Sequence, residues 1–128
     1  MSERDGGRER GSATVWAAVG IAAITTVLVV GLHFGAAVIA RHRAEAAADL
    51  AALAAAGAAV EGAEAACERA ERVVEAMGAT LAACHLDGWD ALVEAHAPVA
   101  IAVPGVDTAS GRARAGPVTP TDPGTEPS

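Results

Sequence analysis

The sequence contains no lysine and no tyrosine, and it has only one phenylalanine and two tryptophans. Nine arginines stand against 16 acidic residues, so the formal net charge is -7 at pH 7. Proteins that bind nucleic acids need clustered basic side chains to neutralise the phosphates. The shortage of basic residues therefore argues against nucleic acid as a partner.

Charged residues are also missing from one long stretch. Between Arg10 and Arg41, from Ser12 to Ala40, there is no Asp, Glu, Lys or Arg. About 20 apolar residues cross the hydrocarbon core of a bilayer as a helix, so residues 12–40 predict a transmembrane helix. A cleaved secretory signal has an apolar core of roughly 7 to 15 residues, which this stretch exceeds. We interpret His33, its one ionisable side chain, as a neutral residue near the interface or a partner helix.

Two glycines of the span, Gly31 and Gly35, form a Gly-x-x-x-Gly step. This spacing gives a smooth helix face on which the backbone of another helix can approach closely. It predicts a homo- or hetero-oligomer formed through the transmembrane helix.

Basic residues and cysteines together predict the orientation in the membrane. Three arginines precede the span and two follow it, which favours a cytoplasmic N-terminus. The only two cysteines, Cys67 and Cys84, both follow the span. An even number of cysteines in a small domain outside the cytoplasm predicts a disulfide, and a reduced cytoplasmic pair is the alternative. We therefore expect a single-pass protein of the cell (inner or plasma) membrane with an extracytoplasmic C-terminal domain.

The chain as a whole predicts an α+β protein in five segments. These are a cytoplasmic stub or leader (1–11), the transmembrane helix (12–40), an extramembrane helical region (41–77), a small β region (78–115) and a disordered tail (116–128). Because Ala is the strongest helix former, the membrane helix is expected to continue to about Val60. A second helical stripe covers Glu64–Met77 and ends at Gly78. Gly57 and Gly62 leave open whether the two stretches form one bent helix or two.

The β region has the pattern of a hairpin with a third strand. The runs Ala79–Leu86 and Trp89–His96 flank Asp87-Gly88, a preferred pair for a two-residue turn. Residues Thr108–Ala115 alternate polar and small side chains, as a half-exposed edge strand does. Between these runs, Pro98 and the pair Pro104-Gly105 are expected to break the ladder. A small antiparallel hairpin or a three-stranded sheet is therefore expected.

The scarcity of large side chains limits the core that this domain can build, because each buried alanine removes little apolar area from water. Such a domain needs a covalent staple or a partner. A Cys67–Cys84 bridge would join the second helix to the first strand.

Patterns for catalysis and metal binding are weak. The hydroxyl residues beyond the span (Thr80, Thr108, Ser110) lack a recognisable arrangement with His and an acid, and there is no glycine-rich phosphate loop. The set Cys67, Cys84, His85 and His96 fits no zinc-finger or zinc-ribbon spacing. We therefore expect no enzyme, no metal and no cofactor.

The order of the motifs resembles a known family. Arg10-Gly11-Ser12-Ala13-Thr14-Val15 leads into the apolar helix, and RAEAAADLAALAAA (43–56) follows it. In these motifs the chain resembles the TadE/TadG-like proteins of tight-adherence (Flp) pilus systems. Later motifs (Cys67–Ala70, Leu86–Gly88 and Arg112–Pro117) are similar to the short actinobacterial TadE-like branch.

The resemblance implies a pilin-like fold and a minor pseudopilin or assembly component of a Flp pilus or related secretion system. The implied partners are the membrane and other pilus or secretion-system components. Prepilin peptidases cut after a Gly that precedes the apolar helix, which here implies cleavage between Gly11 and Ser12. Trp16 replaces the Glu that pilins carry at the fifth mature position, and a Trp there suits an interfacial anchor. The alternative is a single-pass membrane adaptor or regulatory protein with a small extracytoplasmic binding domain.

Overall fold

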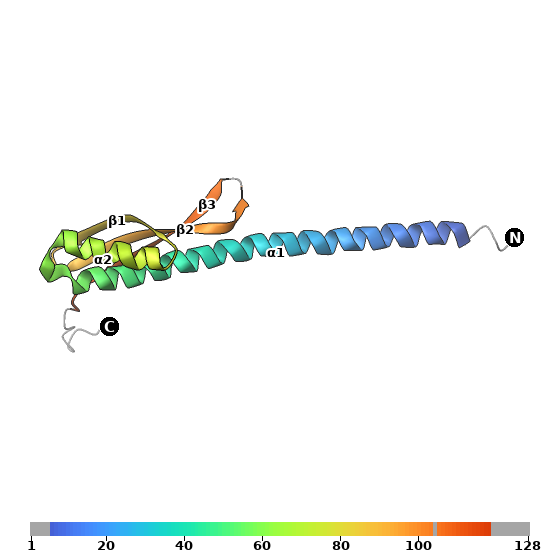
Figure 1. The fold of residues 1–128 in the computed structure, drawn as a ribbon. Helices are drawn as coiled ribbons and strands as arrows, with labels where there is room; N and C mark the ends of the chain where they lie inside the picture. The colour runs from blue at the N-terminus through green and yellow to red at the C-terminus, as the bar shows by residue number, and fades with distance from the viewer. Residues whose placement is uncertain (1–5, 104, 119–128) are drawn as a thin grey trace, which may run out of the picture. The chain divides into compact units, whose positions relative to one another are not determined.

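The computed structural model describes residues 6–103 and 105–118 of the 128-residue chain. In chain order the elements are α1 (Gly6–Gly57), η1 (Ala59–Glu61), α2 (Ala63–Ala76), β1 (Thr80–Asp87), β2 (Asp90–Val103) and β3 (Val106–Ala115) (Figure 1). The strands form one antiparallel sheet in the order β1-β2-β3. The predicted α+β class is therefore confirmed, and of the two expected sheets the three-stranded one forms.

The chain divides into two units, residues 1–36 and residues 37–128. The first unit contains the N-terminal part of α1, which begins at Gly6, so residues 6–11 of the predicted stub are helical. Residues 1–5 of the stub lie outside the described residues, as do residues 119–128 of the predicted tail, whose residues 116–118 have no regular secondary structure. We call the second unit the headpiece.

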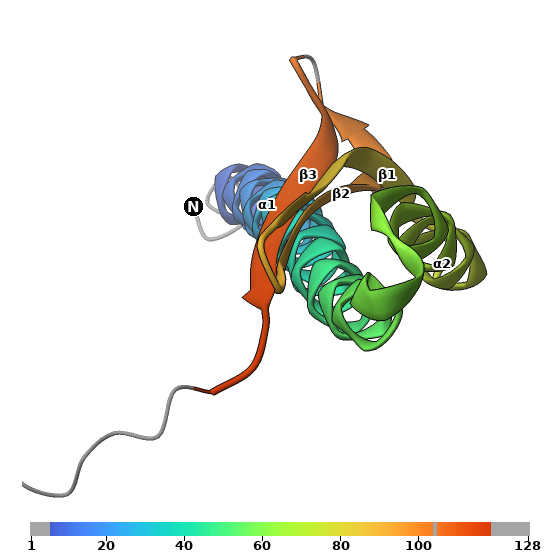
Figure 2. The same cartoon turned by 90° about the vertical axis from the view of Figure 1, so that its left-hand side faces the viewer.

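In the headpiece, the C-terminal part of α1 and α2 lie on the same face of the sheet (Figure 2). The core between them consists almost entirely of alanines, and Val74 is the largest fully buried side chain. Alanines recur every three or four residues along α1, at 44, 47, 48, 51, 52 and 55, which places them on one helix face. Because these side chains are small, this face of α1 is a flat packing surface.

Small side chains let α1 approach the sheet closely. Gly111 in β3 lies directly against the α1 backbone, and a Cβ at this position would overlap the carbonyl group of Ala44 and the amide nitrogen of Glu45. Only glycine fits this site without moving the helix from the sheet. The contact fixes the distance between the two layers of the headpiece.

The predicted second helix forms with one buried stripe. Ala66, Ala70 and Val74 are buried, and Cys67 is half-buried beside them. Gly78 ends the helix with a φ of 71°, and the Ala79 amide donates to the Val74 carbonyl at 3.0 Å. Because η1 separates α1 from α2, the structure has two helices and not one bent helix.

The sheet departs from the sequence prediction at both hairpins. Asp87 pairs with Asp90, so the first turn consists of Gly88 and Trp89 and not of Asp87-Gly88. Gly88 has a φ of 61°, as a turn with Gly at its first central position requires. The second strand continues through Pro98, which is exposed and pairs with Thr108 on β3. Pro98 itself therefore does not break the ladder, but the register shifts between Pro98 and Val103, so the ladder is interrupted directly after the proline. Pro104 lies outside the described residues.

Candidate membrane segment and headpiece surfaces

The N-terminal part of α1 exposes large apolar side chains on every side. All residues from Gly11 to Leu32 are exposed, and Trp16 and Phe34 are exposed by 75% and 71%. Among the described residues, α1 is the one helix long and apolar enough to cross a membrane, within Gly11–Gly57. A soluble protein rarely exposes so much contiguous apolar surface, whereas a bilayer would cover it. The segment is compatible with a single-pass membrane protein.

The polar side chains of this segment bond to their own helix. The hydroxyls of Thr25 and Thr26 donate to the carbonyls of Ile21 and Ala22, each at 2.8 Å. Nδ1 of His33 lies 2.7 Å from the Val29 carbonyl oxygen. Because a carbonyl only accepts, Nδ1 must carry the hydrogen of this bond. Hydrogen bonds of this kind lower the cost of placing polar groups in lipid.

The residues predicted to act in helix packing and processing are accessible on α1. A Cβ added at Gly31 or Gly35 would meet no neighbouring atom within 4 Å, and the same holds for Gly11. Gly11 and Ser12 are both exposed and lie inside the helix. The packing face at Gly31 and Gly35 and the cleavage site at Gly11 and Ser12 therefore remain predictions. The described residues leave both surfaces uncovered.

The predicted disulfide is present. Cys67 of α2 and Cys84 of β1 are joined, with Cα atoms 5.8 Å apart and 17 positions apart in the sequence. Cys84 packs against the core, whereas the neighbouring His85 is exposed, as side chains alternate along a strand. The sulfurs are bonded to each other, so the set considered for zinc is not brought together. The bridge instead fastens the second helix to the sheet.

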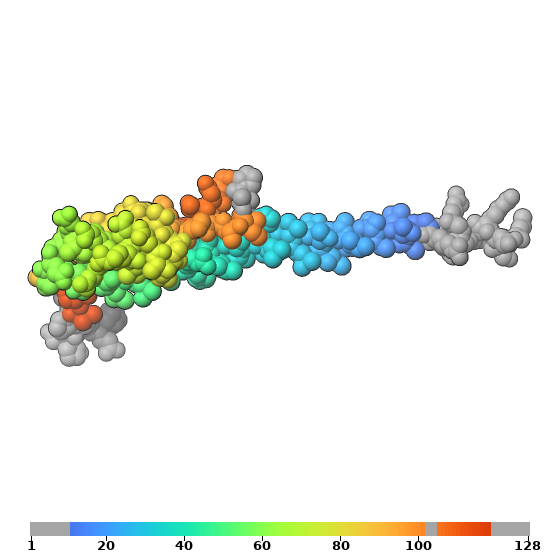
Figure 3. Space-filling model, in the orientation of Figure 1, coloured from blue at the N-terminus to red at the C-terminus, as the bar shows by residue number. Residues whose placement is uncertain are grey.

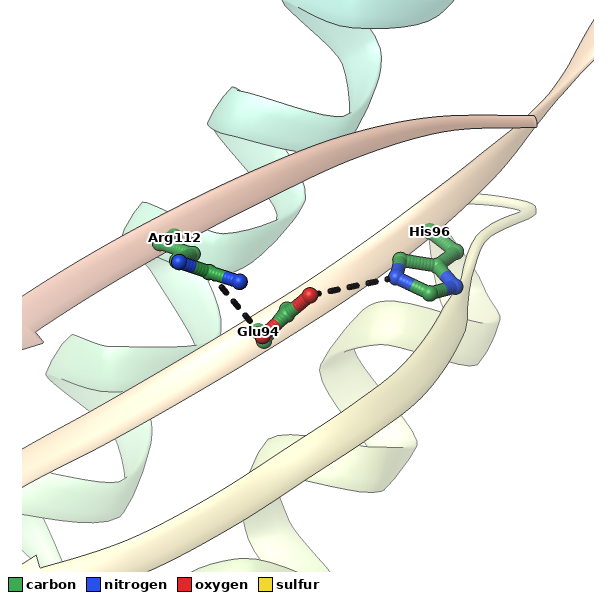
Figure 4. A network of polar contacts seen from close by, with 3 residues as sticks. All are labelled: Glu94, His96 and Arg112. Carbon is green, nitrogen blue, oxygen red and sulfur yellow. Dashed lines mark hydrogen bonds and ion pairs between the residues drawn. The ribbon is translucent and has the colours of Figure 1, made fainter. Parts of the chain in front are cut away.

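The opposite face of the sheet, which we call the outer face, carries a charge network (Figure 4). Glu94 on β2 accepts a hydrogen bond of 3.0 Å from Nε of Arg112, its direct partner on β3. The other carboxylate oxygen lies 3.3 Å from Nε2 of His96. The bond from Arg112 and then that from His96 lower the pKa of Glu94 below its usual value.

A second pair on the outer face joins Asp90 and Arg114. This hydrogen bond raises the pKa of Arg114. Glu94, Arg112 and Arg114 line a shallow groove of about 410 Å³, together with Ala83, His85 and Leu92. Since each arginine already faces a carboxylate, the groove presents little net charge. It shows no nucleophile beside a base and does not suggest a reaction.

The outer-face pairs were not predicted from the sequence. The alternation of Arg112 and Arg114 with small residues placed both arginines on one face of β3, which was visible in the sequence. Their partners depend on the register between β2 and β3.

Comparison with known proteins gives one family match, which covers most of the long helix α1. Residues 11–59 match the family model described as putative Flp pilus-assembly TadE/G-like. No curated protein and no solved structure matches the chain. The match covers α1 from Gly11 to its end and reaches the first residue of η1. It confirms the resemblance there, and the similarity of the later motifs to the actinobacterial branch stays a prediction. Over residues 11–59, which are less than half of the chain, the sequence is similar to the TadE/G-like Flp pilus-assembly proteins.

Proposed function

We propose that this protein is a minor pseudopilin or assembly component of a Flp-type pilus or a related secretion system. The observation that carries the proposal is the family match over residues 11–59, which coincides with the apolar helix. The proposed role is structural and not enzymatic. The partners are the membrane and other components of the pilus or secretion apparatus.

The architecture supports a docking role for α1. Its N-terminal part exposes apolar side chains that need lipid or other apolar helices around them. Gly31 and Gly35 offer a site where such a helix can approach closely. In the proposed role, the helix stays in the bilayer until it packs with helices of the apparatus.

The headpiece supports an extracytoplasmic location for the C-terminal part. A disulfide persists in oxidising compartments and is rare in the bacterial cytoplasm. The Cys67–Cys84 bridge therefore favours the orientation with the N-terminus in the cytoplasm. This orientation places Gly11 on the cytoplasmic side, where a prepilin peptidase would cut before Ser12.

One observation favours a second candidate. Trp16 stands where pilins carry a Glu, and its side chain is exposed by 75% in the helix. A carboxylate at this position could pair with the new amino group of a neighbouring subunit, whereas an indole cannot accept that proton. This difference favours a membrane adaptor that never enters a filament. The two candidates differ in whether processing at Gly11 is needed.

The experiment is a gene deletion in the native host, complemented with variant chains. The readouts are the amount of pili sheared from the surface and the mass of the chain in the membrane. We expect deletion to abolish piliation and the unchanged gene to restore it. Gly11→Phe should fail to restore pili and should accumulate the uncut chain, while the control Gly7→Phe, outside the cleavage junction, should restore them.

The outcomes separate the candidates. If Gly11→Phe restores piliation fully, and neither this variant nor the unchanged chain has lost residues by mass, the adaptor is favoured. Normal piliation in the deletion strain would contradict any role in pilus assembly.

A further inference from the structure

The end of the β2–β3 hairpin is apolar. Residues 97–106 read APVAIAVPGV, without a charged side chain or one that forms hydrogen bonds. Pro98, Ala100 and Gly105 are exposed, and Val106 is exposed by 47%. We call residues 98–101 and 105–106 the hairpin end. Its composition differs from that of the outer face, where charges are paired across the strands.

The hairpin end lies at one end of the headpiece. Gly111 of β3 packs on Ala44, and Ala113 and Ala115 pack against the alanine core. Val106 is five residues before Gly111, which corresponds to about 16 Å along a strand. The hairpin end therefore lies toward residues 37–43 of α1, and Figure 1 shows it at this end of the headpiece. In Figure 3 the orange surface of the same hairpin projects from the headpiece.

The same end of the headpiece contains the boundary of the apolar stretch. The charge-free run stops at Ala40, and Arg41, His42 and Arg43 follow, all exposed. Basic residues directly after a span lie in the headgroup region of the bilayer. An apolar hairpin at this level faces lipid headgroups and the upper acyl chains, not bulk water.

We propose that the hairpin end is a second membrane contact, inserted into the interfacial layer of the bilayer. The proposal rests on the membrane location that the proposed function assumes. Its ligand is a lipid surface, recognised through apolar contact, because the hairpin end carries no basic side chain for a phosphate headgroup. Binding should therefore not require anionic lipid.

Two features limit the depth of insertion. Asp107 is exposed directly after Val106, and a carboxylate is costly in hydrocarbon. The register shift between Pro98 and Val103 interrupts the ladder, so the backbone is not fully paired within the hairpin. Unpaired backbone groups need water or headgroups nearby. The contact is therefore interfacial and does not span the bilayer.

The test places an environment-sensitive fluorophore on the full chain in lipid vesicles. Val106→Cys carries the probe at the hairpin end, and Trp89→Cys carries it at the β1–β2 turn as a matched control. Val106 at the start of β3 and Trp89 in the β1–β2 turn are both exposed positions of the same sheet. Both variants keep the native disulfide and are labelled without reductant. Vesicles consist of phosphatidylcholine with or without phosphatidylglycerol, and a nitroxide at the headgroup level serves as quencher.

We expect the probe at 106 to emit at shorter wavelength in vesicles and to be quenched by the nitroxide lipid, equally with and without phosphatidylglycerol. The probe at 89 should stay in a water-like environment. A blue shift at position 106 without quenching would mean that protein, and not lipid, covers the hairpin end. Water-like emission at both positions would mean that the hairpin end is exposed to water. Either result overturns the proposal.

Trp16 fluorescence separates this failure from a failure of the membrane anchor. It is measured in the unlabelled Trp89→Phe chain, where Trp16 is the only tryptophan left. Quenching of Trp16 by the same lipids, with water-like emission at position 106, would overturn only the hairpin contact. If Trp16 is not quenched either, the membrane location itself is wrong.

Discussion

The contact between Gly111 and α1 gives the sharpest test of how the headpiece packs. In Gly111→Ala, the new methyl group would overlap the backbone of Ala44 and Glu45, which cannot rotate away as a side chain does. Overpacking of a tight core costs about 1–3 kcal/mol. Replacing glycine also removes freedom from the unfolded chain, which stabilises by about 0.4–1 kcal/mol. We therefore expect a net loss of about 1–2 kcal/mol.

Gly57→Ala is the matched control. A Cβ at this position meets no atom within 4 Å, and the backbone is helical. As at position 111, replacing glycine by alanine reduces the freedom of the unfolded chain, but here the new methyl group meets no atom. The free energy of unfolding should therefore stay equal or rise by up to about 1 kcal/mol. The difference between the two variants therefore isolates the helix–sheet contact.

The assay is hydrogen exchange of the β2 and β3 amides in the full chain in detergent micelles, which reports the free energy of opening the headpiece. Faster exchange in Gly111→Ala and unchanged or slower exchange in Gly57→Ala would support the packing. Protection in Gly111→Ala that equals or exceeds that of the unchanged protein would refute the reasoning.

Three further predictions concern the disulfide, the outer face and the core. Replacing Cys67 and Cys84 by alanine should destabilise the headpiece by about 3 kcal/mol in the chain-entropy model, given their separation of 17 residues, as measured by the same exchange assay. The hydrogen bond from Arg112 lowers the pKa of Glu94 in the folded state. The ionised carboxylate therefore stabilises the fold above the unfolded pKa, and this stabilisation is lost as the pH falls through the folded pKa. Glu94→Gln should reduce the loss of stability on acidification, as measured by thermal melts in a pH series. Val74→Ala should cost about 2 kcal/mol, because it removes two buried methyl groups and leaves a cavity, as a shift in the thermal midpoint would show.

Unchanged protection in the double cysteine variant would mean that α2 is held on the sheet without the bridge. An acid response of Glu94→Gln identical to that of the unchanged chain would remove Glu94 from the pH dependence. Val118→Ala, at a position exposed by 92%, should be neutral, and a loss equal to that of Val74→Ala would contradict the assigned core.

Much of the architecture could be predicted from local patterns. The charge-free run, the alanine-rich continuation and the stripe with Ala66, Ala70 and Val74 each predicted a helix that forms. Gly78 marked the end of α2, because a positive φ at that position suits glycine. These features depend on residues near one another in the sequence.

The errors arose where structure depends on strand pairing. Asp87-Gly88 looked like a turn, but the register with β2 moves the turn to Gly88 and Trp89. Pro98 looked like a break, yet it pairs with Thr108, and the register shifts only between Pro98 and Val103. The role of Gly111 could not be predicted either, because its neighbour Ala44 lies far away in the sequence and only the packed helix explains the need for glycine. For the candidate site, the span and the disulfide followed from local rules, whereas the outer-face pairs required the register.

The most direct test of the proposed pseudopilin role is the intact mass of the chain extracted from the native host membrane, measured without reductant and again after reduction. The proposal predicts a mass that lacks Met1 to Gly11 and begins at Ser12, with a gain of two hydrogens on reduction, since Cys67 and Cys84 are joined. A chain that keeps Met1 to Gly11 and carries two free thiols would contradict both the processing and the extracytoplasmic headpiece.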